Sequence, residues 1–550
     1  MPTLLARWIS ILWHPVLSIA VSALWATLLA GGVARGHSVL LWVGGVLAIV
    51  LGFLVWQTRR GGWSHVDASQ PKERRSLNRF LLIGLGIAAA ATAQSGAAEL
   101  ASVLGVVTAS MAVVMLSARW LKISQHCLFA VLPMAWLWPS ALASAVFAVM
   151  ALLVAVSRLR LRRHTAAEVV CGLLLGAVAA LGLALISPTP TAFKPSWVSC
   201  GAAEARDDGW RVAPLPAAVE QRLCEALDAQ VEGGANLHAF LVEQGGRIRF
   251  EAYARGVDRS VGALLPELRR FGPDSPHDLR SISKSVLGLL VVLAEADGTL
   301  DSMQRPVLDF FPEYADLRAG PLQALRLEHL LDMSAGLAWN ESGSYASLSN
   351  SETRMRLADD PLRYVLTREL RFEPGRQFAH SGGNTAVLAE VLERVSGRPL
   401  ADYAQTALFT PLGIDSAEWV RDRRGKALAY SGLRLSARDL ARVGRLLLAG
   451  GRWQERTLLP AAATATLLTP RIDTGDGLRY GRQWWHAAAG VEPAWIAAFG
   501  NGGQRLYLLP SLDMSIVILA GDYNRPGQAQ AGRALLNAVI EEAGLAVETH

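Results

Sequence analysis

The stretch Leu279–Leu290 places a serine and a lysine where they could work together. Ser281 and Lys284 lie at the start of an apolar run, Ile282–Ala294, that predicts a buried helix. Residues three apart on a helix are neighbours, with Cβ atoms roughly 5–6 Å apart. A lysine in apolar surroundings loses affinity for its proton and becomes a base, and a serine beside a base becomes a nucleophile. The pattern therefore indicates acyl transfer, although a serine and a lysine can also share a helix for structural reasons alone.

Other hydrolase and metal-site patterns do not occur in the sequence. The segment Asp332–Gly336 lacks the first glycine of a Gly-x-Ser-x-Gly elbow, and there is no His-Glu-x-x-His. The four cysteines have no Cys-x-x-Cys or metal-ligand spacing, so neither a metal nor an organic cofactor is expected. Cys200 and Cys224 either form a disulfide in an oxidising compartment or are two ordinary thiols.

The first third of the chain is predicted to be a membrane domain, residues 1–190. Of the 550 residues 51% are hydrophobic, and most of this excess precedes residue 190. A helix crosses a bilayer with roughly 20 apolar residues. We therefore expect an all-α bundle of about seven transmembrane helices at Ile11–Val33, Val39–Trp56, Phe80–Ala97, Ala101–Ser117, Cys127–Trp138, Ala141–Val156 and Ala166–Ile186.

The basic residues of this region predict its orientation. They fall between the second and third, fourth and fifth, and sixth and seventh predicted spans, namely Arg59, Arg60, Lys72, Arg74, Arg75, Arg79, Arg119, Lys122, Arg158, Arg160, Arg162 and Arg163. Loops rich in lysine and arginine stay in the cytoplasm. We therefore expect a multi-pass protein of the cytoplasmic membrane with its C-terminal domain on the periplasmic or extracytoplasmic side. The net charge of +6 forms no continuous basic patch, so the lipid bilayer, and not nucleic acid, is the expected partner.

Two polar clusters in this region could also carry chemistry. Arg158, His164 and Glu168 follow the pattern Ser-Arg-x5-His-x3-Glu, and His126 lies upstream on the same predicted membrane face. This resembles the type 2 phosphatidic acid phosphatase superfamily. The resemblance implies that His164 attacks phosphate, Glu168 orients it, Arg158 binds phosphate and His126 protonates the leaving group. The superfamily's first motif is absent, however, and the bland interpretation is that the arginines set topology and the histidines cap helices.

The C-terminal part reads as a soluble α/β (α+β) domain. Three prolines, Pro188, Pro190 and Pro195, end the apolar region, and residues 191–234 are expected to be a linker and lead-in to a domain at 235–550. Strand-like runs joined by short turn segments predict hairpins at Ala239–Val242 with Ile248–Tyr253 and at Arg505–Pro510 with Met514–Ala520, and an amphipathic pattern predicts a final helix at Gln528–Ala543. Strands at both ends of a helical middle indicate one antiparallel sheet built from both termini.

Six motifs in this domain occur in a characteristic order. They are Ser281-x-x-Lys284, His329–Glu341, Pro374–Phe378, Leu433–Ala441, Tyr480–Trp485 and Gly500–Gln504. Together they resemble the class C β-lactamase-related serine hydrolases, and most closely their 6-aminohexanoate-dimer hydrolase branch. The resemblance covers about residues 235–540 and implies a β-lactamase/transpeptidase-like domain.

The resemblance also implies roles for individual residues. Ser281 would attack an acyl carbonyl and Lys284 would take its proton, while the amides of Ser281 and of the Asn501-Gly502-Gly503 turn would form the oxyanion hole. His380 stands where the family has a tyrosine, and histidine relays protons at neutral pH. Four residues are candidates for lining the pocket, and core or surface packing explains them equally well: Trp339, Glu341, Trp484 and Trp485. The lysine of the usual third motif is absent, which argues against β-lactamase activity.

The sequence therefore predicts a membrane-anchored serine hydrolase acting on a small-molecule or peptide ester or amide. One alternative is a catalytically impaired module that senses peptidoglycan fragments or β-lactams, with His380 as the impairing change. Another is a fusion in which the membrane domain is also a lipid phosphatase. The sequence specifies neither the substrate nor the oligomeric state.

Overall fold

The computed structural model describes residues 4–5, 8–9, 52–62, 71–94, 98–134, 141–186, 194–263, 266–341, 345, 347–525 and 527–548. The chain divides into two compact units. The N-terminal unit comprises Met1–Lys194 with Ala263–Leu268, and the C-terminal unit comprises Pro195–Gly262 with Arg269–His550.

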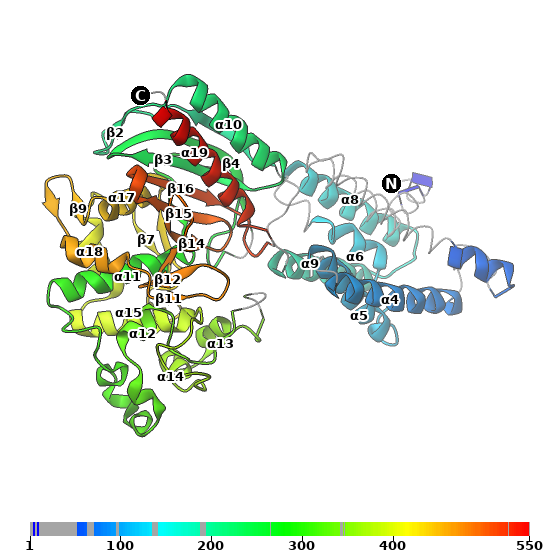
Figure 1. The fold of residues 1–550 in the computed structure, drawn as a ribbon. Coiled ribbons are helices and arrows are strands. Elements are labelled where there is room, and N and C mark those ends of the chain that lie inside the picture. The colour runs from blue at the N-terminus through cyan, green and yellow to red at the C-terminus, as the bar shows by residue number, and fades with distance from the viewer. Residues whose placement is uncertain are drawn as a thin grey trace. The chain divides into compact units, whose positions relative to one another are not determined.

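The described part of the N-terminal unit is helical (Figure 1). Its helices are α4 (Pro71–Gln94), α5 (Ala98–Ser117), α6 (Gln125–Val131), α8 (Ala141–Arg160) and α9 (Ala166–Ile186). The short helix α6 is the most deeply buried, because Cys127, Leu128 and Ala130 have no exposed surface. Glycines of α9 permit this packing: a Cβ on Gly172 would lie 2.6 Å from the Ser124 carbonyl oxygen. Small residues at the contact between two helices let their backbones approach closely.

Two segments of these helices are long and apolar enough to cross a bilayer, Arg75–Gln94 and Ala166–Ala184, and Ala101–Ser117 is a shorter apolar helix. Of the predicted spans, Ile11–Val33 and the larger part of Val39–Trp56 lie outside the described residues. The span predicted at Cys127–Trp138 includes most of the 7-residue helix α6, and its last four residues, 135–138, lie outside the described residues. The other predicted spans overlap α4, α5, α8 and α9, and of these helices only α4 and α9 contain a segment of bilayer-crossing length.

The C-terminal unit is built on one large twisted sheet. Its strands follow the order β1 (Ser196–Gly201), β4 (Arg247–Asp258), β3 (Leu237–Gln244), β16 (Met514–Ala520), β15 (Gln504–Leu509), β14 (Ile496–Gly500), β13 (Trp484–His486), β12 (Arg479–Gly481) and β11 (Ile472–Asp473). Two further strands, β2 (Arg211–Val212) and β5 (Glu267–Arg270), pair with β4. Neighbours along the main path are antiparallel, and Ile518 of β16 lies opposite Phe240 of β3. The predicted antiparallel sheet formed from both ends of the domain is confirmed.

Helices cover both faces of this sheet (Figure 1). On one face Phe240 and Val242 of β3 pack with α10 (Ala217–Glu232) and α19 (Gln530–Glu548). On the other face Ala239 and Leu241 join a core that includes α11 (Ile282–Ala296) and α17 (Ala437–Leu448). Because successive side chains of a strand point to opposite faces, an almost continuously apolar strand such as β3 must be covered on both sides.

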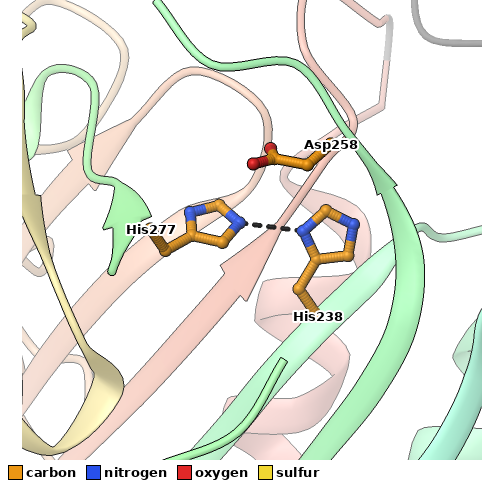
Figure 2. A group of neighbouring side chains, drawn as sticks. All are labelled: His238, Asp258 and His277. Carbon is orange, nitrogen blue, oxygen red and sulfur yellow. Dashed lines mark hydrogen bonds between the residues drawn. The ribbon is translucent and has the colours of Figure 1, made fainter. Parts of the chain in front are cut away.

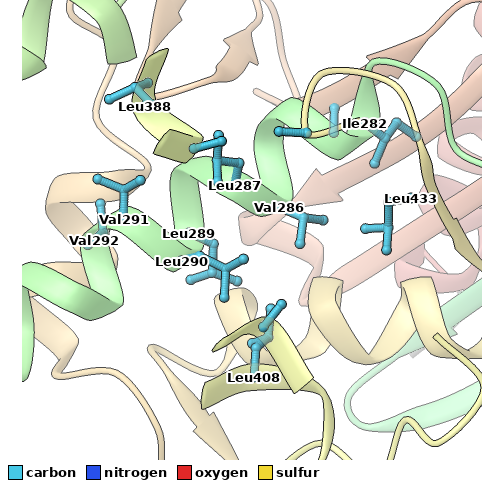
Figure 3. Packing of buried hydrophobic residues seen from close by; sticks show 14 of the residues in the cluster. Ile282, Val286, Leu287, Leu289, Leu290, Val291, Val292, Leu388, Leu408 and Leu433 are labelled. Atoms are coloured by element: carbon cyan, nitrogen blue, oxygen red, sulfur yellow. The ribbon is translucent and has the colours of Figure 1, made fainter. Parts of the chain in front are cut away.

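Helix α11 lies at the centre of the second core. Figure 3 shows its apolar side chains meeting Leu388 of α15 (Gly382–Ser396), Leu408 of the π-helical turn η4 (Gln405–Phe409) and Leu433 of β8 (Leu433–Leu435). Strand β8 pairs with β6 (His277–Asp278) and β7 (Glu418–Trp419) in a small three-stranded sheet. The remaining elements are η1 (Val307–Phe310), η2 (Pro312–Ala319), η3 (Pro321–Ala324), α12 (Leu327–Leu331), α13 (Ser351–Leu357), α14 (Pro361–Leu366), α16 (Leu400–Ala404), β9 (Arg452–Trp453), β10 (Arg456–Thr457), α18 (Ala461–Leu467) and η5 (Pro510–Leu512).

The segment expected to be a linker and lead-in, residues 191–234, is largely part of the C-terminal unit. It contains β1, β2 and α10, and the unit begins at Pro195. Cys200 of β1 and Cys224 of α10 form a disulfide that ties the edge strand to this helix. The last of the three prolines, Pro195, is therefore the first residue of the C-terminal unit, and the lead-in supplies two strands of its sheet and one helix that covers it.

Candidate active site

Ser281 stands at the N-terminus of α11, at the end of a short strained turn. Arg280, directly before it, has a positive φ of 52°, which non-glycine residues adopt at an energetic cost. Two contacts hold the turn: Ser283 Oγ donates a hydrogen bond to the Arg280 carbonyl oxygen at 2.6 Å, and the Arg280 guanidinium lies 4.1 Å from the centre of the Tyr523 ring. The turn follows β6, so the small sheet and α11 together fix where the serine is presented.

The side chains of Lys284 and Ser281 form a direct hydrogen bond. Lys284 Nζ lies 2.9 Å from Ser281 Oγ and also donates to the Tyr430 carbonyl oxygen at 3.0 Å. The lysine is 1% exposed, so water does not compete for its amine. This geometry confirms the prediction that the three-residue spacing on this helix brings the serine and the lysine together. The arrangement fits a serine nucleophile with an amine base.

His380 forms a second pair with Glu341. Its Nδ1 lies 3.1 Å from Glu341 Oε2. An ionised carboxylate can only accept, so Nδ1 carries a proton and donates it, and in the neutral form of the ring the free lone pair is then on Nε2. Glu341 therefore selects the tautomer of His380 that can accept a proton at Nε2. This is the same relation that orients the histidine of serine protease triads.

The carboxylate of Glu341 is itself held by two further donors. Trp339 Nε1 donates to Oε1 at 2.6 Å, and the Gly382 backbone N–H donates to the same oxygen at 2.5 Å. Gly382 must be glycine here, because a Cβ at this position would lie 2.8 Å from Glu352 Oε2 and 3.0 Å from Glu341 Oε1. Two carboxyl groups thus occupy the space beside Gly382 into which a longer side chain would project.

The pKa values of these two buried carboxyl groups, Glu341 and Glu352, are shifted in opposite directions. Burial by itself would raise the pKa of Glu341, but the charge and hydrogen bond of His380, the charge of Lys284 and the Gly382 N–H outweigh it and lower the pKa. Burial and the neighbouring charge of Glu341 raise the pKa of Glu352. Two carboxylates this close cannot both ionise readily, so Glu341 carries the charge and Glu352 the proton. Glu341 therefore interacts with both His380 and Lys284.

The four candidate pocket residues have different roles. Trp484 is fully buried in the core, so for this residue the packing interpretation is correct. Its neighbour Trp485 is partly exposed and stacks near His380, with ring centroids 6.3 Å apart and planes at 25°. Trp339 and Glu341 form the support of His380 described above. Trp485 is therefore the tryptophan that borders the reactive groups.

Comparison with known proteins bears directly on this geometry. The beta-lactamase family, described as "Beta-lactamase", matches residues 219–539, which is more than half of the chain. The chain belongs to the beta-lactamase family. Ser281, Lys284 and His380 all lie inside the matched region.

Individual relatives agree with this assignment. A 6-aminohexanoate-dimer hydrolase from Paenarthrobacter ureafaciens is 32% identical over 301 residues, covering 51% of this chain and 72% of that protein. Esterase EstB from Burkholderia gladioli is 29% identical over 188 residues, covering 33% of this chain and 46% of the esterase. A solved structure titled as a 6-aminohexanoate-dimer hydrolase from Bacillus anthracis matches with a TM-score of 0.51 and 22% identity over 64% of this chain and 91% of that one, a similarity of fold. This beta-lactamase-family chain is a serine hydrolase.

The Gly500–Gln504 motif lies beside Leu279, two residues before Ser281, but its side chains and one of its backbone amides already form hydrogen bonds with other residues. The Gly500 backbone packs against the Leu279 carbonyl oxygen. Asn501 exchanges two hydrogen bonds with Asn524, one through Asn501 Nδ2 at 2.6 Å and one to its Oδ1 at 2.9 Å. The Gly502 N–H donates to Gln528 Oε1, so it is not an oxyanion donor in this arrangement. The Asn501 and Gly503 backbones stay predictions for that role.

In the N-terminal unit, two of the four predicted phosphatase residues form a pair. His164 Nδ1 lies 3.0 Å from Glu168 Oε2, and the Glu168 side chain also accepts the Thr165 backbone N–H at 3.0 Å, which caps α9. Burial and the positive charges of Arg158 and Lys122 lower the pKa of His164 against the raising effect of Glu168. Arg158 is thus an electrostatic neighbour of His164. His126 lies in the first turn of α6.

Two residues of the C-terminal site were missed from the sequence. Glu352, in α13, is one of 47 acidic residues and no motif sets it apart. Tyr430 contributes only its backbone carbonyl, which every residue possesses. Neither has a signal in the sequence, because their roles come from where the fold brings them.

Proposed function

We propose that this chain is a membrane-anchored hydrolase that cleaves esters or amides through an acyl-enzyme on Ser281. The observation that carries the proposal is the 2.9 Å contact between Lys284 Nζ and Ser281 Oγ, completed by the pair of His380 and Glu341. A buried amine next to a hydroxyl at a helix N-terminus has the geometry for nucleophilic catalysis.

Acylation uses Lys284 in its unprotonated form, in which Nζ takes the proton from Ser281 Oγ as the Oγ–carbon bond forms. The carbonyl electron pair moves onto oxygen, which the Ser281 N–H and an amide of the Asn501 turn would stabilise. The intermediate then expels an alcohol or an amine, which receives the proton that Lys284 took from Ser281. We assign this proton relay to His380, whose Nε2 is kept as an acceptor by Glu341.

Deacylation repeats these steps with water. A water molecule loses a proton to the same basic groups and attacks the acyl carbon, and Ser281 Oγ leaves with a proton as the acid product forms. The replacement of the family's tyrosine by His380 is compatible with this cycle, because a neutral imidazole accepts and returns a proton near pH 7.

The names of the relatives indicate which class of substrate to propose for this chain. One is a hydrolase of a 6-aminohexanoate dimer, one is an esterase and others are D-aminopeptidases. We propose for this chain a small-molecule or peptide ester or amide without a required carboxylate anchor, since the third motif, Gly500–Gln504, contains no lysine. Trp485 would provide an apolar surface for the acyl group.

The test is covalent labelling of the full chain with a fluorophosphonate probe, followed by ester and amide turnover. Wild type is expected to label and Ser281→Ala to lose labelling. Ser285→Ala is the matched control, because Ser285 is a buried serine of the same helix whose Oγ bonds the Gln483 carbonyl oxygen. Labelling that persists in Ser281→Ala would refute the assignment of the nucleophile.

The same assay separates the hydrolase from a binding module. A module that senses peptidoglycan fragments or β-lactams would acylate once and stop, giving a stoichiometric burst without turnover. Continued release of product after the burst supports the hydrolase, whereas a burst alone supports the sensor and identifies deacylation as the impaired step.

We propose that the N-terminal unit anchors the hydrolase in the cytoplasmic membrane, with the C-terminal unit outside. Three observations support this: two helices are of bilayer-crossing length, large apolar side chains of the N-terminal helices are exposed (Leu116, Leu152, Leu174 and Val178), and Cys200 is bonded to Cys224. Exposed apolar surface of this extent needs an apolar partner, and disulfides persist in oxidising compartments. An alkaline phosphatase fused after residue 190 is expected to be active, and an inactive fusion of normal abundance would refute this orientation.

A second candidate function, phosphate-ester hydrolysis by the N-terminal unit, is favoured by the pair of His164 and Glu168 beside Arg158. A histidine oriented by a carboxylate next to a cation suits attack on phosphate. Phosphate release from phosphatidic acid is expected to be lost in His164→Ala and kept in Ser281→Ala. If wild type releases no phosphate from this lipid, the unit is an anchor only.

A further inference from the structure

Three buried side chains from three strands of the C-terminal unit meet (Figure 2). His238 lies on β3, Asp258 at the end of β4 and His277 on β6, and one donor atom from each lies within 4.8 Å of the other two. The relative exposed surface of all three is 0%. They lie 20 and 19 residues apart in the chain, so no short sequence pattern connects them.

The outer nitrogen of each ring is fixed as a donor. Asn236 Nδ2 donates to the Val257 carbonyl oxygen at 2.7 Å, which turns Asn236 Oδ1 toward His238 Nε2, 3.1 Å away. Because Oδ1 only accepts, His238 Nε2 carries a proton. His277 Nδ1 lies 3.0 Å from the Asp278 carbonyl oxygen, which likewise only accepts, so this nitrogen is protonated as well.

The inner nitrogens of the two neutral rings must then both be lone pairs. His238 Nδ1 and His277 Nε2 face each other across 2.8 Å, as the dashed line in Figure 2 marks. Two lone pairs at this distance repel unless a cation lies between them. That cation is either a single shared proton or a metal ion, and metal-binding histidines are commonly fixed by donation from the other ring nitrogen to a carbonyl or amide oxygen.

Asp258 provides a third donor group of the kind that a metal uses. Its Oδ1 accepts from Tyr523 Oη at 2.8 Å, and its Oδ2 accepts from Arg269 Nη1 at 2.9 Å. Each carboxylate oxygen has about two lone-pair positions, so each keeps one for a metal. With a proton shared between the two rings Asp258 would serve only as a counter-charge, whereas a metal ion would also use these lone-pair positions.

The His238 ring is also closely enclosed by its neighbours. Phe271 stacks on it, with centroids 4.3 Å apart and planes at 16°. The backbones of two glycines approach so closely that a Cβ on Gly256 would lie 2.6 Å from ring carbon Cδ2 and a Cβ on Gly521 would lie 2.6 Å from Cε1. Such prior fixing of a ring in one orientation is what a metal site requires of its ligands.

We propose that His238, Asp258 and His277 bind one divalent transition-metal ion of the zinc class. Two imidazoles and a carboxylate suit such ions, and a bidentate carboxylate gives four donor atoms. Metal–nitrogen distances of about 2.0–2.1 Å would separate the two inner nitrogens by about half an ångström more than they are now. Because the site is fully buried, the ion would be structural. It would join β3 and β4 to β6, the strand that leads into Ser281.

The experiment uses the full chain, stripped with a chelator, loaded with zinc alone and desalted. Wild type is expected to keep one equivalent of zinc and His238→Gln to keep none above background. His486→Gln is the matched control, since His486 is also a buried histidine on a strand of the same sheet. Fluorophosphonate labelling of each variant reports whether it is folded. The loss of zinc in His238→Gln while labelling continues supports the site.

X-ray absorption of zinc-loaded wild type provides the second measurement, independent of any variant. Two imidazoles and oxygen donors are expected around the ion. Sulfur donors would place the zinc at the free cysteines Cys127 and Cys171 and would overturn the proposal. Wild type that retains no zinc would also overturn it and would mean that the two rings share a proton.

Discussion

Replacing Glu341 by glutamine tests the central claim about the active site, that this carboxylate sets the tautomer of His380. Glutamine has the same shape, and its amide oxygen can replace Oε1, which accepts from Trp339 and Gly382. The amide NH2 would then face His380 Nδ1, where Oε2 now lies 3.1 Å away. Because NH2 only donates, Nδ1 must become the acceptor, and the proton moves to Nε2.

This tautomer removes the proton acceptor of the relay. General acid–base catalysis contributes roughly 10²–10⁴-fold, and a tautomer error of this type in a serine protease triad lies at the upper end of that range. We therefore expect kcat of Glu341→Gln to fall by about 10²–10⁴, which corresponds to about 3–5 kcal/mol in the activation free energy. KM is expected to change little, because the shape of the site is kept.

The assay is turnover of an activated ester by Glu341→Gln, Glu352→Gln and wild type, with thermal unfolding of each. Glu352 is the matched control, because it is buried beside Gly382 like Glu341 and its raised pKa keeps it protonated. A neutral glutamine imitates a neutral acid, so Glu352→Gln is expected to stay within about threefold of wild type.

Activity of Glu341→Gln within about threefold of wild type would refute the tautomer argument. Equal large losses in Glu341→Gln and Glu352→Gln, with lowered thermal stability in both, would also refute it, since they would show a packing requirement in place of a charge requirement.

Three further predictions concern the same domain. Gly382→Ala introduces a Cβ against two glutamate carboxyls and is expected to cost about 1–3 kcal/mol of stability and at least tenfold in kcat, measured by thermal unfolding and ester turnover; a fully active, equally stable variant contradicts the packing described. The raised pKa of Glu352 destabilises the folded chain as pH rises from the ordinary carboxyl range to the raised value, so Glu352→Gln should match wild type near pH 4 and unfold several degrees higher near pH 8; a pH-independent difference would count against it. Replacing Arg438 by alanine is expected to lower the free energy of unfolding by about 3–5 kcal/mol, because the arginine is 2% exposed and pairs with the buried carboxylate of Glu251 at 2.7 Å. In the same unfolding measurement the exposed pair of Arg376 with Glu373 should show no detectable change, and equal effects would contradict the role of burial.

Much of the C-terminal fold could be predicted because its signals are local. The hairpin of β3 and β4 turns at Gly245 and Gly246, both with positive φ, and the strand-forming residues on either side of this turn predict the two strands. Helix α11 was evident from its continuous apolar run. The segment 191–234 was misjudged as a linker, because strands of two to six residues have too little alternation to be detected.

The site could be predicted only where the chain itself brings groups together. The spacing of Ser281 and Lys284 on one helix turn places their side chains side by side in any fold that keeps the helix. Trp484 and Trp485 could not be told apart, because adjacent residues of a strand point to opposite sides and the sequence does not say which side is the core. The structure buries Trp484 and leaves Trp485 beside His380.

The amino-acid sequence by itself determined that Ser281 and Lys284 lie side by side, that the sheet is antiparallel and that the N-terminal third is apolar. These depend on helix and strand periodicity and on composition, which are properties of neighbouring residues. Only the tertiary structure decided that Glu341 orients His380 from 39 residues away, that Glu352 holds a proton beside it, and that His238, Asp258 and His277 meet. The physical reason is that burial, pKa and hydrogen-bond partners depend on which distant segments share the same space.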